Sequence, residues 1–375
     1  MKAHHYASVE ALVAALQPGY PVYCLKPAVL ARAARRFLEG FPGRVMYAVK
    51  CNPNPLVLRA FWDAGLRDFD TASLAEIAAV RELGPEAGCY YMHPVKSRTS
   101  ILTAHAVYGV RHFVIDDPQE LAKILDETDR PKELAILVRM ATPTAKARYE
   151  LSRKFGARPD AAAALMRAVH AAGCATGLAF HVGSQCLTPE AYGDGLALAG
   201  QVIADAGVPV RHLDVGGGFP ASYVGEEPPP LDAYFDAVRA GLAAIRLPED
   251  CTVWCEPGRA LVAAGCSLLV QVQLVRDDAV FINDGVYHSL SEAITGQLRH
   301  PARLLRPGES FSATMRDFTV FGPTCDSTDL LPYRMPLPDD VREGDWIEIA
   351  DVGAYSNALA THFNGVYPDT FVTFG

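Results

Sequence analysis

The chain alternates short β-prone runs with helical patterns eight times over its first two thirds, and this alternation constrains the fold more than any other feature. The runs that we interpret as strands are 45–50, 68–73, 89–93, 112–117, 134–140, 178–184, 212–218 and 251–259. Helical patterns lie between them, for example at 56–64, 74–83, 118–127, 160–172, 192–206 and 231–245. Eight strand–helix repeats predict a (β/α)8 TIM barrel, whose active site lies at the carboxyl ends of its strands.

Polar side chains collect near the ends of these predicted strands. They are Lys50, Asp70, Ser73, His93, Asp116, Arg139, His181, Ser184, Glu256 and Arg259. An amine such as Lys50 at the end of an apolar strand loses hydration, so its pKa falls and it can attack an aldehyde as the free base. Taken alone, Lys50 would more often be a surface lysine, but the seven other strand ends favour the catalytic interpretation.

The pattern changes after about residue 264. The predicted strands there are 268–276, 279–284, 311–321, 346–352 and 366–374, and turns rich in Gly, Pro and Asp join them. A further strand at 21–25 precedes the barrel and is a candidate to pair with this sheet. We therefore predict a barrel domain of residues 26–264 and an all-β domain formed by residues 1–25 and 265–375.

Composition excludes several classes of protein. A chain of 375 residues, half of them hydrophobic, can bury more than one core. The formal charge of −9 argues against nucleic acid or an anionic membrane as a partner, and no apolar run reaches the roughly 18 residues of a membrane span. We see no signal peptide, and nine scattered cysteines fit reduced thiols rather than a disulfide framework or a metal site. These features predict a cytoplasmic protein without a structural metal.

Three consecutive glycines, 216–218, follow the strand that ends near Asp214, so backbone amides there can approach an anion closely. A tight turn explains most such triplets, and the loop lacks the spacing and the lysine of a nucleotide-binding P-loop. Glu256, Gly258 and Arg259 add a carboxylate, another glycine amide and a cation. An amine, an anion-binding loop and a carboxylate are the three contacts that pyridoxal phosphate requires.

Eight motifs occur in order along the chain. They are Ala48–Asn52, Phe69–Ser73, Leu151–Gly156, His181–Ser184, Asp214–Pro220, Glu256–Arg259, Gly322–Asp326 and Gly353–Tyr355. This set resembles the fold-type III, pyridoxal-phosphate-dependent ornithine, lysine and diaminopimelate decarboxylases, and it is most similar to the ornithine decarboxylase branch. The resemblance runs from about residue 20 to the C-terminus. It implies an alanine-racemase-like barrel, a β-domain and a head-to-tail homodimer with each active site at the subunit interface.

The resemblance also implies roles for individual residues. Lys50 would bind pyridoxal 5′-phosphate covalently, Glu256 would keep the ring nitrogen protonated, and His181 would lie against the ring. The implied phosphate contacts are Ser184, Gly217, Gly218, Gly258, Arg259 and Tyr355, and the implied polar network around Lys50 is Asp70, Glu76 and Arg139. By spacing alone, the last three would be ordinary surface or ion-pair residues.

The β-domain carries the other implied residues. Cys325 would return a proton to the substrate in the active site of the partner subunit, and Asp326, with Tyr287 nearby, would meet the distal amine of the substrate. Without the flanking motif, a buried thiol and a turn aspartate would be the more ordinary interpretations. Lys154 and Asp329 match an ion pair between subunits.

Gly296 departs from the ornithine decarboxylase pattern, in which an acidic residue stands at about this position and shares the distal ammonium of the substrate. A buried ammonium with a single carboxylate partner is poorly compensated. Glu292 is a candidate substitute, and Arg299 is a candidate partner for a distal carboxylate. A bulkier or carboxylate-bearing amino acid is therefore an alternative substrate.

We predict a pyridoxal-phosphate-dependent decarboxylase of a basic L-amino acid, with ornithine or lysine as the first choice. An amino-acid racemase shares the fold and cofactor, but it would be expected to present a tyrosine where this chain has Cys325. A non-catalytic regulatory homologue would tend to lose the lysine or the phosphate contacts, and this chain keeps both.

Overall fold

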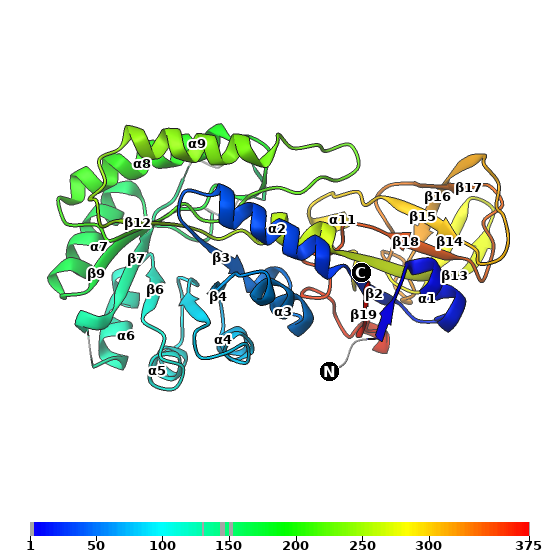
Figure 1. Ribbon diagram of the computed structural model, residues 1–375, viewed down its shortest axis with the longest axis horizontal. Helices are drawn as coiled ribbons and strands as arrows, with labels where there is room; N and C mark the ends of the chain where they lie inside the picture. The colour runs from blue at the N-terminus through cyan, green and yellow to red at the C-terminus, as the bar shows by residue number, and fades with distance from the viewer. Residues whose placement is uncertain (1–3, 130, 143–146, 150–152, 375) are drawn as a thin grey trace. The chain divides into compact units, whose positions relative to one another are not determined.

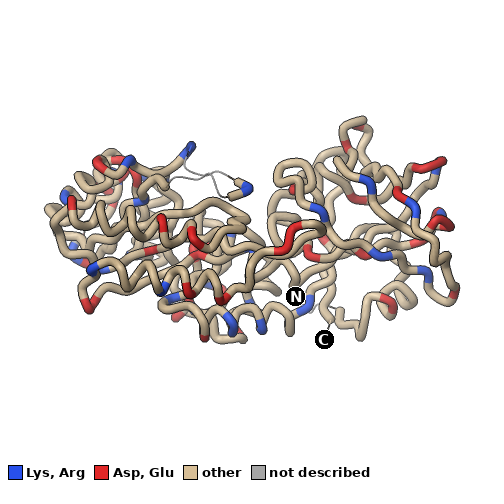
Figure 2. The backbone as a smooth tube through the Cα atoms, turned by 90° about the horizontal axis from the view of Figure 1, so that it is seen from above, with Lys and Arg blue, Asp and Glu red and all other residues tan. Residues whose placement is uncertain are grey.

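The computed structural model describes residues 4–129, 131–142, 147–149 and 153–374. The chain divides into two compact units. The barrel unit comprises Ala34–Pro220 and Pro228–Gly258, and the sheet unit comprises Met1–Ala33, Ala221–Glu227 and Arg259–Gly375. Figure 2 shows acidic and basic residues interspersed along both units.

Eight parallel strands close into a barrel, in the order β11-β12-β3-β4-β5-β6-β7-β9. They are β3 (Arg44–Ala48), β4 (Asp68–Thr71), β5 (Gly88–Tyr91), β6 (His112–Ile115), β7 (Ala135–Arg139), β9 (Ala175–Ala179), β11 (His212–Asp214) and β12 (Thr252–Cys255). The predicted TIM barrel is confirmed. Several predicted ranges extend past the C-terminal ends of their strands, because they include polar residues of the following loop.

Helices alternate with the barrel strands, as the sequence periodicity predicted (Figure 1). They are α2 (Pro27–Gly40), α3 (Pro55–Asp63), α4 (Leu74–Arg81), α5 (Arg98–Ala106), α6 (Pro118–Glu127), α7 (Pro159–Ala171), α8 (Glu190–Ala206) and α9 (Leu231–Ala244). Local capping sets their starts. In α6, for example, Asp117 accepts a hydrogen bond from the Gln119 amide and Pro118 occupies the first turn.

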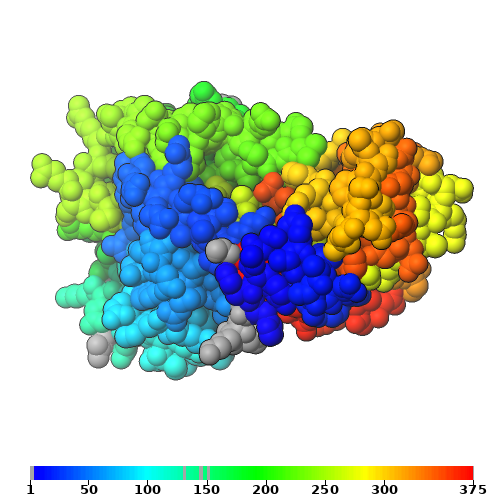
Figure 3. Space-filling view, turned by 45° about the vertical axis from the view of Figure 1, so that its right-hand side comes forward, coloured from blue at the N-terminus to red at the C-terminus, as the bar shows by residue number. Residues whose placement is uncertain are grey.

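The sheet unit contains a nine-stranded sheet whose strands come from both ends of the chain. They are β1 (His4–Tyr6), β2 (Val22–Leu25), β13 (Cys266–Arg276), β14 (Ala279–Ile282), β15 (Ala302–Leu305), β16 (Met315–Phe321), β17 (Met335–Pro338), β18 (Trp346–Ile349) and β19 (Thr370–Phe374). β2 pairs with β13 and β19, which confirms that the N-terminal strand completes the β-domain. Figure 3 shows the N-terminal segment, in dark blue, against the red C-terminal segment, as expected from the pairing of β1 with β19.

Each unit has its own core. In the barrel unit, Met46, Tyr90, Val114, Leu137 and Trp254 belong to one buried cluster. In the sheet unit, α1 (Val9–Leu16) packs Val9, Leu12 and Val13 against residues of β2, β13, β18 and β19. In the sheet unit, sequence analysis missed β1, β15 and β17. They are only three or four residues long, and prolines at two positions of β17 hide its strand pattern.

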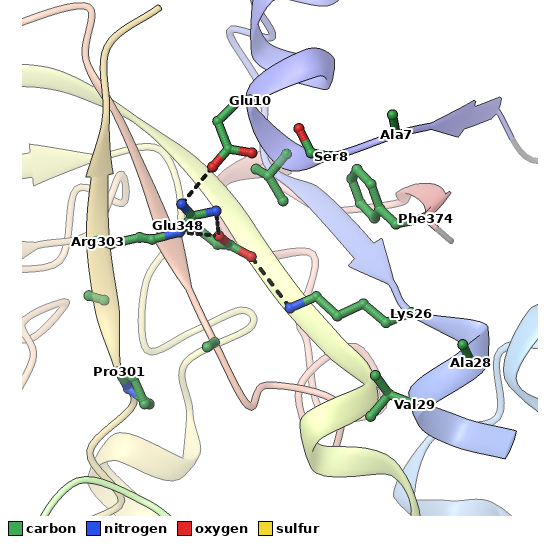
Figure 4. Close-up of a pocket in the computed structure, with 13 residues that line it drawn as sticks. Ala7, Ser8, Glu10, Lys26, Ala28, Val29, Pro301, Arg303, Glu348 and Phe374 are labelled. Atoms are coloured by element: carbon green, nitrogen blue, oxygen red, sulfur yellow. Dashed lines mark hydrogen bonds and ion pairs between the residues drawn. The ribbon is translucent and has the colours of Figure 1, made fainter. Parts of the chain in front are cut away.

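The sheet unit has a cavity of about 580 Å³, shown in Figure 4. Its charged side chains alternate: Arg303 donates to Oε1 of Glu10 at 2.6 Å and to Oε2 of Glu348 at 2.7 Å, and Lys26 lies 3.5 Å from Glu348. The residues lining this cavity include none of the predicted site residues. Because these charged side chains are paired with one another, we interpret them as a structural chain of ion pairs in the lining of the cavity.

Within the residues that the structure describes, none of the helices has the length and hydrophobicity needed to span a membrane.

Candidate active site

Lys50 lies in a 3-10 turn, Val49–Cys51, that directly follows β3. Its Nζ donates a hydrogen bond to Oδ2 of Asp70 at 2.6 Å, and Asp70 is buried at the end of the neighbouring strand β4. The Lys50 side chain retains 39% of its exposure, so solvent reaches part of it. The pair places a partly accessible amine, held by a buried carboxylate, at the carboxyl ends of the strands.

Ser73 and Glu76 shape the start of α4 beside this pair. Ser73 caps the helix by accepting a hydrogen bond from the Glu76 amide, and Oε2 of Glu76 accepts from the Ala72 amide at 2.7 Å. These contacts give Glu76 a structural role at the helix start. Burial raises the pKa of the Glu76 carboxyl, while the Ala72 amide opposes that rise.

Arg139 ends β7 and faces the loop that carries Phe155 and Gly156. Its guanidinium lies 5.6 Å from the centre of the Phe155 ring, and the Gly156 amide donates to Asp116 at 2.9 Å. Burial lowers the pKa of Arg139, while Glu256, Asp116 and Asp70 oppose that shift. Of the motif 151–156, Leu151 and Ser152 lie outside the described residues.

His181 follows β9, and its Nδ1 accepts a hydrogen bond from the Gly183 amide at 3.0 Å. This bond fixes the tautomer, because Nδ1 must then be unprotonated and Nε2 carries the hydrogen. Burial, with Arg139 and Lys50 nearby, holds the His181 pKa well below its usual range. The ring is therefore a neutral, oriented imidazole.

The glycine loop after β11 approaches its neighbours closely. A Cβ at Gly217 would lie 2.5 Å from the Glu256 carbonyl oxygen and 3.0 Å from Nε2 of His181. Gly218 has φ of +105°, and a Cβ there would lie 2.4 Å from the Gly183 carbonyl oxygen. Tyr192 donates from its hydroxyl to the Gly217 carbonyl at 3.0 Å. The loop therefore needs glycine both for space and for its backbone conformation.

Ser184 and Gly258 lie on two further segments of the barrel unit. Ser184 opens β10 (Ser184–Cys186), which pairs antiparallel with β8 (Ala147–Tyr149). Gly258 lies beside Ala48 and Cys51, since a Cβ there would be 3.0 Å from that of Cys51. The Ala48 amide also donates to the Pro257 carbonyl at 3.1 Å. These contacts tie the segment after β12 to the turn that carries Lys50.

Glu256 follows β12, beside Asp214 at the end of β11. The Glu256 amide donates to the Gly216 carbonyl at 2.9 Å, and the Gly216 amide donates to Oδ1 of Asp214 at 2.8 Å. Burial raises the pKa of Asp214 to about 6. Burial and the neighbouring Asp214 hold the Glu256 pKa well above its usual range. We did not identify Asp214 from sequence as the neighbour of Glu256; its position at a strand end was the available signal.

In the sheet unit, Arg259 opens α10 (Arg259–Val262) and is buried in an ion pair with Glu292. Its two terminal nitrogens donate to the two carboxylate oxygens at 2.6 and 2.7 Å, and Tyr223 accepts a further bond at 2.9 Å. Tyr355, with φ of +52°, places its ring 5.1 Å from the guanidinium carbon. The predicted phosphate residues Arg259 and Tyr355 therefore contact each other.

The exposed Cys325 adjoins a half-buried pair, Asp326 and Tyr287, in the same unit. Among the nine cysteines, all of which lie in described segments, Cys325 alone is exposed. The Tyr287 hydroxyl donates to Oδ2 of Asp326 at 2.7 Å, and the Asn364 side chain accepts from the Cys325 amide at 3.0 Å. Hydrogen bonds from Tyr287 and Thr328 lower the Asp326 pKa, so its carboxylate stays charged.

Asp329 is buried beneath these residues. Its oxygens accept hydrogen bonds from the Val286 amide and from the amide and hydroxyl of Thr324. It therefore orders the turn that carries Cys325. A pairing of Asp329 with Lys154 of another subunit stays a prediction.

Gly296 ends the short helix α11 (Glu292–Thr295), and its amide donates to the Glu292 carbonyl at 3.0 Å. Glu292, the candidate substitute for the missing acid, lies on this helix but binds Arg259 with both oxygens. Arg299 lies over the Tyr333 ring at 5.4 Å. Glu292 is thus committed to an arginine rather than held ready for a substrate ammonium.

The barrel unit fits pyridoxal phosphate on structural grounds. It presents a partly accessible amine, a glycine loop that any Cβ would obstruct, a neutral imidazole and a buried carboxyl pair. When bound, the cofactor supplies an electron sink for the electron pair left as CO2 departs. Lys50 would hold its aldehyde carbon, Glu256 its ring nitrogen, and the amides of Gly217 and Gly218 its phosphate.

Comparison with known proteins identifies the class of protein to which the chain belongs. Residues 28–263 match the family model "Pyridoxal-dependent decarboxylase, pyridoxal binding domain". The lysine/ornithine decarboxylase of Selenomonas ruminantium is 33% identical over 332 residues, covering 86% of this chain and 81% of that protein. Antizyme inhibitor 2 of Xenopus laevis is 32% identical over 364 residues, covering 88% and 75%.

A solved structure of a decarboxylase has a similar fold. The crystal structure of the Paramecium bursaria Chlorella virus arginine decarboxylase bound to agmatine has a TM-score of 0.87 and 27% identity, covering 97% of this chain and 99% of that one. The fold and site therefore define a pyridoxal-phosphate-dependent carboxy-lyase. The chain belongs to the family of pyridoxal-dependent decarboxylases, with members similar to ornithine decarboxylase, and its reaction is the decarboxylation of an amino acid.

Proposed function

We propose that the substrate is a basic L-amino acid, with ornithine or lysine as the first choice, and that the product is the corresponding amine or a polyamine precursor. The observation that carries this proposal is the charged carboxylate of Asp326, held by Tyr287 beside the exposed thiol of Cys325. A carboxylate with a lowered pKa suits a distal ammonium, because a charge-assisted hydrogen bond is stronger than a neutral one.

In this proposal each group has a defined task. Asp70 accepts a hydrogen bond from the Lys50 amine and so fixes its direction. The neutral His181 ring orients the cofactor without adding a positive charge. Arg259 and Tyr355 are further phosphate contacts. Cys325 of the partner subunit returns a proton from its Sγ to the substrate carbon that has lost CO2.

The proposal includes an assembly. We infer a cytoplasmic homodimer in which the β-domain, residues 1–25 and 265–375, contributes Cys325 and Asp326 to the partner's barrel of residues 26–264. The exposure of Cys325 supports this, and the neighbouring Asp326 is only half-buried in the sheet unit.

Gly296 supports a second candidate, the decarboxylation of a bulkier or carboxylate-bearing amino acid. With Glu292 bound to Arg259, Asp326 is the remaining predicted acid for a distal ammonium. A racemase is less well supported, because Cys325 stands where a racemase would be expected to present a tyrosine. A non-catalytic role, for which the similarity to antizyme inhibitor 2 is relevant, is opposed by the intact pair of Lys50 and Asp70.

A CO2-release screen tests the proposal. The purified protein, supplied with pyridoxal phosphate, is assayed with ornithine, lysine, arginine, diaminobutyrate, diaminopimelate and carboxyalkyl polyamines, with Lys50→Ala as the inactive control. We expect release from ornithine or lysine. CO2 release from a carboxylate-bearing compound alone would favour the second candidate, the decarboxylation of a bulkier or carboxylate-bearing amino acid. Racemisation without CO2 release would contradict both decarboxylase proposals.

A further inference from the structure

Tyr192 contacts the glycine loop from the first turn of α8. Its hydroxyl donates a hydrogen bond to the Gly217 carbonyl oxygen at 3.0 Å, and a Cβ at Gly218 would lie 3.3 Å from the same hydroxyl oxygen. The side chain is fully buried, and burial holds the Tyr192 pKa well above its usual range. The hydroxyl therefore keeps its proton and acts as a donor on the buried side of the loop.

This hydrogen bond fixes the direction of one peptide group. The Gly217 carbonyl and the Gly218 amide belong to the same planar trans peptide, so they point in opposite directions. Because the carbonyl is directed at the buried hydroxyl, the amide is directed away from it, and Gly218 is itself only half-buried. Among the described residues, no acceptor is bound to the Gly218 amide. This amide is therefore available to a bound anion.

The same hydrogen bond strengthens the Gly218 amide as a donor. A proton donated to the carbonyl oxygen draws electron density through the peptide group, which makes the N–H of Gly218 more positive. Hydrogen bonds polarise one another most where water is excluded, and the Tyr192 side chain has no solvent exposure. The hydroxyl therefore both aims and polarises the Gly218 amide.

Other contacts hold the loop without the hydroxyl. The Cys186 amide donates to the Gly218 carbonyl at 2.9 Å, and the Tyr192 ring stacks on Phe219 with the ring centres 4.8 Å apart. Tyr192→Phe would keep this stacking and the backbone bond from Cys186. The change therefore removes one hydrogen bond, at the Gly217 carbonyl, from a loop that is otherwise supported.

We propose that Tyr192 is a positioning residue for the cofactor phosphate: its hydroxyl holds the peptide group between Gly217 and Gly218 so that the Gly218 amide is directed at a phosphate oxygen. Tyr192 acts through the peptide group and does not itself touch the cofactor. This role rests on the proposed phosphate contact of the glycine loop. It does not depend on which amino acid is the substrate.

Binding of two forms of the cofactor separates a phosphate contact from general damage to the fold. Pyridoxal phosphate and pyridoxal, which lacks the phosphate, are titrated into cofactor-free wild type and Tyr192→Phe. The affinity of Tyr192→Phe for pyridoxal phosphate should fall about tenfold, the effect of weakening one hydrogen bond to a charged group, whereas its affinity for pyridoxal should match that of wild type. Equal loss for both compounds, or no loss for pyridoxal phosphate, would overturn the proposal.

Tyr234→Phe is the matched control. The Tyr234 hydroxyl is buried and donates to the Cys186 carbonyl at 2.9 Å, so this change also leaves a buried carbonyl without a tyrosine donor. Urea unfolding of the cofactor-free proteins should show similar losses of stability for the two variants. Tyr192→Phe alone should lose affinity for pyridoxal phosphate. A similar loss of affinity in Tyr234→Phe would show that loosening the core is sufficient, and it would overturn the positioning role.

Nuclear magnetic resonance observes the peptide group itself. Residues 216–218 are the only adjacent glycines in the sequence, so protein labelled with glycine that carries ¹³C at its carbonyl and ¹⁵N at its amide gives signals across a labelled peptide bond from Gly217 and Gly218 alone. In wild type, inorganic phosphate should shift the Gly218 amide proton to higher frequency. In Tyr192→Phe without phosphate, the Gly217 carbonyl carbon should move to lower frequency, and phosphate should then shift the Gly218 amide proton less.

The wild-type spectra decide the underlying contact without a variant that must fold. If neither glycine amide responds to inorganic phosphate or to pyridoxal phosphate, the proposed phosphate contact of the loop is wrong, and the role of Tyr192 fails with it. If the wild-type amides respond and those of Tyr192→Phe respond equally, with the Gly217 carbonyl carbon unchanged, the phosphate contact is confirmed and the positioning role alone is wrong.

Discussion

Nζ of Lys50 lies 2.6 Å from Oδ2 of Asp70, and this pair joins the turn after β3 to the end of β4. The amine therefore has a fixed direction before any cofactor is bound. Because Asp70 is buried and Lys50 is partly accessible, the carboxylate acts as an anchor and the amine as the group that reaches outward.

Lys50→Ala should abolish covalent attachment of the cofactor. Borohydride reduction of wild type should fix pyridoxal phosphate on Lys50 and remove its visible absorption band. Mass spectrometry of peptides locates the label. Lys26→Ala, which removes a lysine of the sheet unit ion-paired with Glu348, is the matched control and should still be labelled at Lys50. A reduced adduct on Lys50→Ala would contradict the assignment.

Two inactive variants should restore activity when mixed. Lys50→Ala removes the barrel contribution and Cys325→Ala the contribution of the β-domain, so a mixed dimer regains one complete site. Random exchange of subunits would give at most about a quarter of wild-type CO2 release. Native mass spectrometry establishes that mixed dimers form. Their presence without any recovered activity would be incompatible with a shared site.

Gly296→Asp should improve kcat/KM for ornithine by ~1–3 kcal/mol in transition-state stabilisation, since it adds a second acid for the distal ammonium. Steady-state kinetics with ornithine and lysine measure the effect, and Gly296→Asn controls for size without charge. A loss of the native reaction with no gain for ornithine would favour the bulkier or carboxylate-bearing substrate. If wild type and Gly296→Asp are both inert toward both amino acids, the basic-substrate proposal is wrong.

Glu292→Leu should lower the free energy of unfolding by ~3–5 kcal/mol, because it leaves the buried Arg259 without its bidentate carboxylate. Urea denaturation at constant pH measures the loss. The exposed pair of Arg36 and Asp232 provides the comparison, since Asp232→Ala should cost less than ~1 kcal/mol. Similar losses for the two variants would show that the buried pair is not required for stability.

Asp284 predicts a pH dependence in the sheet unit. Burial raises its pKa to about 7, although Ser289 and Gly285 donate hydrogen bonds to it. A folded pKa above the unfolded value means that Asp284 destabilises the fold as pH rises from about 4 to about 7, by up to about 1.4 kcal/mol per pH unit. Asp284→Asn should flatten this part of the urea-unfolding profile. An unchanged slope would show that Asp284 is ionised in the fold across this range.

The sequence by itself determined the repeated strand–helix architecture, the β-domain and the ordered motifs. These are local signals: β-prone runs, helical periodicity, caps such as Asp117 with Pro118, and residue types at strand ends. The short strands β15 and β17 gave too few residues for a pattern, and β9 is poor in bulky β-formers, so its predicted run began three residues late.

Only the tertiary structure decided which side chains meet. Asp70 binds Lys50, Asp214 lies against Glu256, and Glu292 binds Arg259 instead of standing ready as a substitute acid. Each of these contacts joins residues 20 to 42 positions apart in the sequence, on neighbouring strands or separate elements. Their proximity depends on strand register and on backbone turns such as Gly216, which no local pattern encodes. Burial raises the pKa of Asp214 and of Glu256, because desolvation depends on the packed surroundings rather than on the residue type.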